Sequence, residues 1–143
     1  MRRKMKNKMI AIISAIQVVA ALCVLGAVKI WAPVCSGMLT LETGKEVAMK
    51  CHYAGQAAIA VAVILLVSAG ITFFAKSAHK LVQVISIVGA VMLFLLFTSL
   101  IGICANTQMS CHTTALWGKG AAIVTIIAAV VDLLAGKKGQ IPN

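Results

Sequence analysis

Four long apolar runs dominate the chain, and short segments that hold most of the charged residues separate them. The runs are approximately Met9–Ile30, Gly55–Ala75, Leu81–Ile103 and Thr113–Leu134. Each has about 20 residues, which at about 1.5 Å per residue is enough to cross about 30 Å of hydrocarbon. The fourth run contains Lys119, which can extend its ammonium group to the membrane interface. The pattern predicts an all-α integral membrane protein with four transmembrane helices.

The composition supports a lipid environment. Of the 143 residues, 62% are hydrophobic and only 11% are charged, too few to cover the surface of a soluble domain. The net charge of +10 raises the possibility of nucleic-acid binding. However, the positive charges gather at the ends of the apolar runs, where they anchor helices to lipid headgroups. We therefore expect the lipid bilayer, and no nucleic acid, as a partner.

The distribution of lysine and arginine predicts the orientation in the cell membrane. Nine of them lie within residues 1–8, 76–80 and 136–143, whereas Lys29, Lys45, Lys50 and Lys119 lie on the other side. Because the cytoplasmic side carries the excess of positive charge, both termini are predicted to be cytoplasmic. The first apolar run is long for a cleaved signal peptide, which favours an uncleaved first span.

The two halves of the chain show an internal duplication. Aligning Cys51 with Cys111 matches the second and fourth spans, and aligning Cys35 with Cys104 matches the first and third. The sequence therefore predicts one membrane domain over residues 1–143, built from two parallel two-span repeats of about residues 9–75 and 81–135.

Small residues recur at a spacing of four in the second and fourth spans. Such residues let helix backbones approach closely in lipid, which predicts that these two spans touch at the centre of the bundle. The positions are Ala54, Ala58 and Ala62, matched by Thr114, Gly118 and Ala122.

Cys35, Cys51, Cys104 and Cys111 fall on the predicted outer side, and three chemistries compete for them. The first is a pair of structural disulfides, Cys35–Cys51 and Cys104–Cys111, each joining the two ends of one outer loop. Another is thiol redox chemistry as in membrane thiol oxidases, although the chain lacks their Cys-x-x-Cys pair.

The remaining alternative for these cysteines is a soft-metal or haem site. Met49, Cys51 and His52, repeated as Met109, Cys111 and His112, offer thioether, thiolate and imidazole ligands. Covalent c-type haem is excluded, because no cysteine stands three positions before either Cys-His pair. If disulfides consume the thiols, the two histidines and two methionines remain as ligands, and we expect the histidines to face the bundle or its outer cleft. No cofactor is the leading expectation, with haem or a soft metal as the alternative.

Two motifs resemble a known family. Pro33-Val34-Cys35 and Met49-Lys50-Cys51-His52, with the following Gly-Gln-Ala, look like those of an uncharacterised bacterial family of small four-span membrane proteins, catalogued as a domain of unknown function. The resemblance covers essentially the whole chain and implies an envelope protein, with a loose association with transporter components. Two departures are Tyr53, where tryptophan is expected, and His112, where a basic residue is common. The second argues against a two-histidine metal site.

The leading functional hypothesis is a non-enzymatic accessory or structural subunit. It would act through contacts with another membrane protein, such as a transporter permease, or as a homo-oligomer. The alternative is an outer-face redox or metal/haem-binding protein that uses the Cys-His pairs. Within the spans, Gln17, Gln83, Ser86 and Thr98 are expected to join helices by hydrogen bonds, and Asp132 to form an ion pair near the inner interface. His79 is interpreted as an ordinary loop residue.

Overall fold

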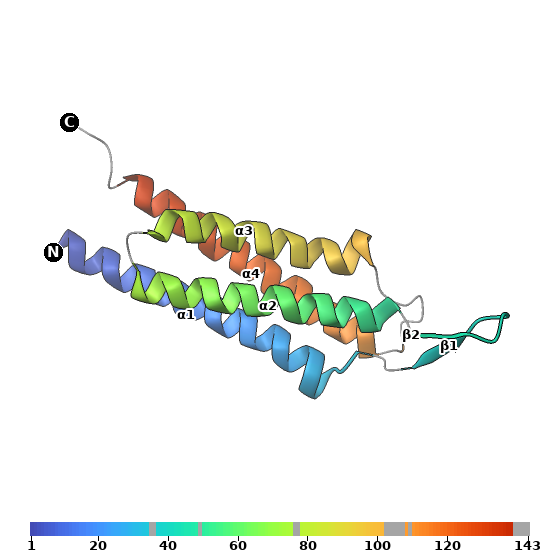
Figure 1. Ribbon diagram of the computed structural model, residues 1–143. Helices are drawn as coiled ribbons and strands as arrows, with labels where there is room; N and C mark the ends of the chain where they lie inside the picture. Colours follow the sequence, from blue (N-terminus) through green and yellow to red (C-terminus); the bar gives the residue numbers. More distant parts are fainter. Residues whose placement is uncertain (35–36, 49, 76–77, 102–107, 109, 139–143) are drawn as a thin grey trace.

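The computed structural model describes residues 1–34, 37–48, 50–75, 78–101, 108 and 110–138, and shows a four-helix bundle (Figure 1). The helices are α1 (Arg2–Gly26), α2 (Lys50–Phe74), α3 (His79–Leu95) and α4 (Ser110–Lys138). By length and apolar composition all four can cross a membrane, which confirms the four predicted spans. The start of α1 and the end of α4 lie at one end of the bundle, the terminal end, and the strands β1 and β2 project from the other (Figure 1).

Two helices end in the same unusual way. α1 continues as a π-helical segment η1 (Ala27–Trp31), and α3 continues as η3 (Leu96–Leu100). Beyond η1, Pro33 lacks a backbone N–H and disfavours helical backbone in the preceding residue, so the helix cannot continue. The π turns thus mark the places where α1 and α3 stop at the loop end of the bundle.

A small β-hairpin outside the bundle was not predicted. Strands β1 (Met38–Thr40) and β2 (Glu46–Ala48) pair antiparallel, with Thr40 opposite Glu46. Gly44 closes the turn with φ of 77°, a conformation that glycine adopts without the steric cost of a side chain. Among its described side chains Val47 and Met38 are exposed, and the strands are joined by their backbone ladder.

The helices pack as a ring. α1 contacts α2 and α4, and α3 contacts the same two helices. Within the described part of the chain, α2 and α4 are not packed against each other as neighbouring helices are. The predicted close contact between them at the centre of the bundle is therefore wrong. Their small residues are nevertheless buried, because they face the interior that all four helices enclose.

The buried interior divides along the bundle axis. Toward the loop end it is apolar, with small side chains on α2 and α4 facing larger ones on α1 and α3. Toward the terminal end it becomes polar. The apolar cluster comprises Val24, Val28, Ala54, Ala58, Ala62, Ala90, Leu93, Phe97, Ala115 and Ala122.

Burial follows the predicted alignment of the two halves. With Cys51 opposite Cys111, residues 51–72 are paired with residues 111–132. The two residues of a pair are both buried, both half-buried or both exposed, except in the pairs 57/117 and 70/130. With Ile13 opposite Val82, the π segment at 27–31 falls on the π segment at 96–100. These matches agree with the proposed duplication of a two-span unit, which stays a prediction from the sequence.

Candidate functional site

The cysteine and histidine motifs lie at the loop end of the bundle. Cys51 and Cys111 are buried in the first turns of α2 and α4, and His52 and His112 are half-buried beside them. Four members of the predicted ligand sets lie outside the described residues, namely Cys35, Met49, Cys104 and Met109. The metal or haem site therefore stays a prediction. Within the described part of the chain, no three His, Cys, Asp or Glu side chains are grouped to hold a metal ion.

The two buried cysteines differ in their bonding. Cys111 is a free thiol, so the predicted Cys104–Cys111 bridge is not formed in the structure. Its side chain is 3% exposed because α4 begins at Ser110, which places Cys111 on the interior face of the helix. Cys51 is engaged with a partner outside the described contacts, and the pairing Cys35–Cys51 stays a prediction.

His52 interacts within its own helix. Its Nε2 atom lies 3.1 Å from the amide nitrogen of Gln56, one turn along α2, and its ring meets the Tyr53 ring edge to face. His112 also has an interaction partner. Both histidines are half-buried, but the described contacts do not bring them together, and the expectation that they face the bundle or its outer cleft stays a prediction.

The start of α4 is fastened to the end of α1. The Ser110 hydroxyl donates a hydrogen bond of 2.9 Å to the Pro33 carbonyl, and the Thr114 hydroxyl donates to the Ala32 carbonyl. Trp31 and Trp117 pack edge to face, with ring centroids 5.9 Å apart. Carbonyl groups that leave the helical ladder after η1 thus find donors on another helix, which stabilises the loop end of the bundle.

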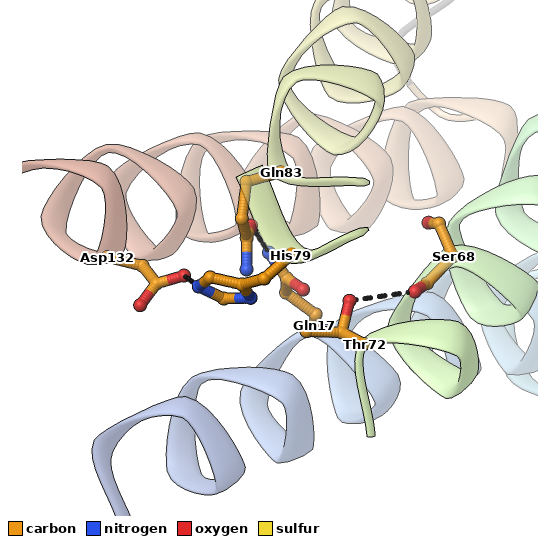
Figure 2. Close-up of polar contacts among 6 residues, drawn as sticks. All are labelled: Gln17, Ser68, Thr72, His79, Gln83 and Asp132. Carbon is orange, nitrogen blue, oxygen red and sulfur yellow. Dashed lines mark hydrogen bonds and ion pairs between the residues drawn. The ribbon is translucent and has the colours of Figure 1, made fainter. Parts of the chain in front are cut away.

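The terminal half of the bundle contains a set of polar side chains from all four helices, which we call the polar layer (Figure 2). His79 is half-buried and the other members are buried. At this depth a polar group that lacks a partner is costly, so intramembrane polar clusters mark either structural joints or functional sites. The polar layer comprises Ser14, Gln17, Ser68, Thr72, His79, Gln83, Ser86 and Asp132.

An ion pair is the most strongly charged part of the polar layer. His79 Nε2 lies 2.5 Å from Asp132 Oδ2, and the two side chains are 15% and 4% exposed. The Gln83 amide and the Lys6 ammonium add weaker attractions to the same carboxylate. The predicted ion pair of Asp132 is present, but its partner is His79, because Asp132 faces the interior, where α3 begins.

Hydrogen bonds join several other members of the polar layer across helices. The Gln17 side-chain amide donates a hydrogen bond of 2.9 Å from Nε2 to Gln83 Oε1, and this bond links α1 to α3 across the bundle. The Ser68 and Ser86 hydroxyls lie 3.4 Å apart and link α2 to α3. The roles predicted for Gln17, Gln83 and Ser86 are therefore observed, whereas the Thr98 hydroxyl bonds the Phe94 carbonyl of its own helix.

The sequence interpretation missed His79. It is the first residue of α3, and only the register of α3 against α4 places it opposite Asp132. One signal was available, because Asp132 is the only acidic residue in a span and therefore needs a cationic neighbour. His79 and Asp132 also line a pocket of about 360 Å³ that α1, α3 and α4 form at the terminal end.

A second hollow is a groove on the lipid-facing side between α1 and α4, with a volume of about 720 Å³. It extends from Ile12 to Cys23 along α1, which is about 17 Å at the rise of an α-helix. Across from these lie Gly120, which has no side chain, and Ala121 of α4, and these two residues leave the groove open. The lining residues are Ile12, Ala15, Ile16, Val19, Ala20, Cys23, Leu116, Trp117, Gly120, Ala121 and Val124.

Four apolar spans, a polar layer inside them and a small hairpin beyond them define a multi-pass membrane protein. The chain belongs to the family described as Domain of unknown function (DUF4418), which matches residues 17–135. This match confirms the resemblance to an uncharacterised family of four-span proteins. No curated protein and no solved structure matches the chain.

Proposed function

We propose that the protein is an accessory membrane subunit that receives a transmembrane helix of another membrane protein in the groove between α1 and α4. The observation that carries the proposal is the groove itself, which is lined by apolar and small side chains over about three turns of α1. In lipid, helices associate through close backbone approach and van der Waals packing, and small residues permit that approach.

The comparison of the two halves supports a helix as the occupant. In the predicted alignment, Ala15 and Cys23 of α1 correspond to the larger Val84 and Met92 of α3. The groove therefore lies beside α1, whose side chains are smaller at these two positions than those of α3. In other respects the two halves bury corresponding residues. A partner helix with large apolar side chains would fill the space that these smaller residues leave.

Photocrosslinking in native membranes tests the proposal. A benzophenone amino acid replaces Val19 in the groove, and Val88, the corresponding residue of α3, serves as the matched control. The two valines are 59% and 63% exposed, so both reach the lipid-facing surface. We expect the Val19 probe, but not the Val88 probe, to give an adduct with a transmembrane segment of one particular membrane protein.

A second variant pair tests whether the groove must be open. Gly120→Leu fills the groove, whereas Ala60→Leu adds a comparable side chain at the corresponding exposed position of α2. We expect only Gly120→Leu to abolish the Val19 adduct. Adducts with lipid alone would contradict the proposal. An adduct of two copies of this chain would replace the partner by a homodimer.

A further inference from the structure

We propose that the pocket at the terminal end of the bundle binds the phosphate group of an anionic phospholipid. This site is separate from the groove between α1 and α4, and no residue lines both. The inference goes beyond the proposed function and does not depend on it. It rests on the charges, walls and depth of the pocket.

Cationic side chains come to the pocket from two helices. Lys6 belongs to the start of α1, and His79 and Lys80 are the first residues of α3. Asp132 is the one acidic residue in the lining, and it is held by His79 at 2.5 Å. Among the lining side chains two lysines stand against one carboxylate, so the lining itself is net positive and favours an anion.

The walls of the pocket are apolar. Met5, Met9 and Ile10 of α1 face Leu133 of α4 across it. Free phosphate would gain nothing from these side chains, whereas the glycerol and upper acyl segments of a lipid would bury apolar surface against them. The combination of a cationic rim with apolar walls therefore favours a phospholipid over a soluble anion.

The depth of the pocket matches the level of lipid phosphates. Lys6 precedes the most apolar part of the first span, His79 opens the third span, and Gly136 ends the fourth. The pocket consequently lies where helices leave the hydrocarbon, and basic pockets between transmembrane helices at this level bind anionic headgroups. The backbone N–H groups at the start of α3 add a favourable field for an anion.

Native mass spectrometry of the full chain in detergent tests the inference. The ligands are phosphatidylglycerol, phosphatidylcholine and inorganic phosphate, titrated separately. We expect discrete binding of one phosphatidylglycerol, weakened about tenfold or more in Lys6→Gln/Lys80→Gln, since each lysine contributes an attraction to the anionic group. The variant Lys6→Arg/Lys80→Arg keeps the charges and should keep most of the binding.

Lys4→Gln/Lys8→Gln is the matched control, because it removes the same two charges from α1 residues that do not line the pocket. Circular dichroism verifies that all variants remain helical. Equal weakening by both pairs would show diffuse attraction to the basic terminus and overturn the site. Equal binding of phosphatidylcholine would also overturn it, and displacement of the lipid by millimolar inorganic phosphate would assign the pocket to a soluble anion instead.

Discussion

Replacing His79 by leucine removes the nearest opposite charge from the Asp132 carboxylate, which is 4% exposed. Breaking a buried ion pair from one side costs about 3–5 kcal/mol, because the remaining charge stays out of water. The Gln83 amide and the Lys6 ammonium remain near the carboxylate. We therefore expect His79→Leu to lower the free energy of unfolding by about 3 kcal/mol, at the lower end of that range.

The opposite replacement should cost less. In Asp132→Asn the imidazole of His79 can stay neutral, so that no uncompensated charge remains. The loss is then that of one hydrogen bond to a charged group, about 1.5–3 kcal/mol. The double variant His79→Leu/Asp132→Leu removes both charges, and we expect it to unfold within about 1 kcal/mol of the wild type, since apolar replacement of a buried pair is often neutral.

Unfolding in mixed micelles with increasing dodecyl sulfate, followed by helical circular dichroism, measures these differences. The decisive quantity is the coupling between the two sites, obtained from the single variants His79→Leu and Asp132→Leu and the double variant His79→Leu/Asp132→Leu. If the double variant is as unstable as the sum of the single variants, the ion pair contributes nothing specific. If Asp132→Asn costs more than His79→Leu, the argument from the stranded carboxylate is wrong.

Three further predictions concern packing, thiols and orientation. Gly118→Ala should destabilise the bundle by about 1–3 kcal/mol, because a Cβ there would lie 2.5 Å from Phe97 Cε2, while Gly120→Ala, with open space, should not; thermal unfolding in detergent compares them. In denatured protein without reductant, Cys111 should react with maleimide, whereas Cys51 should react only after reduction; peptide mapping identifies the labelled residue. Labelling of Cys51 before reduction would contradict the predicted Cys35–Cys51 disulfide. A cysteine at position 78, introduced into a variant without native cysteines, should react with an impermeant reagent in opened but not in intact cells if the termini are cytoplasmic, and labelling of intact cells would reverse the topology.

The polar layer and the groove constrain the molecule differently. Hydrogen bonds between Gln17 and Gln83 and between Ser68 and Ser86 tie α3 to two other helices inside the bundle. The groove, in contrast, is a surface that the chain leaves uncovered between α1 and α4. Internal polar contacts therefore hold the bundle together, and the lateral surface is where another molecule can be accommodated.

The hairpin shows where the sequence interpretation was too coarse. Thr43-Gly44 lies between two short segments with β-forming residues, which is a recognisable turn signal. The strands β1 and β2 on either side of this turn have only three residues each. Three residues are too few to show the alternation of apolar and polar positions on which strand prediction depends.

The number of spans was determined by the sequence alone, although the helices extend beyond the apolar runs, as α1 does by beginning at Arg2. Twenty apolar residues must satisfy their backbone groups internally in lipid, and a helix is the way for a single segment to do so. This constraint acts on each segment separately, so it can be evaluated without knowing the neighbours. The family membership, shown by the match over residues 17–135, is likewise a property of the sequence.

Which helices touch, and which polar side chains meet, was decided only by the tertiary structure. The small residues of α2 and α4 predicted a close contact between these helices, but small residues lower the cost of approach to any neighbour and do not select one. His79 and Asp132 are far apart in the chain, and their 2.5 Å contact depends on the register of α3 against α4. Register and partner choice arise from the packing of four helices together, which no single segment encodes.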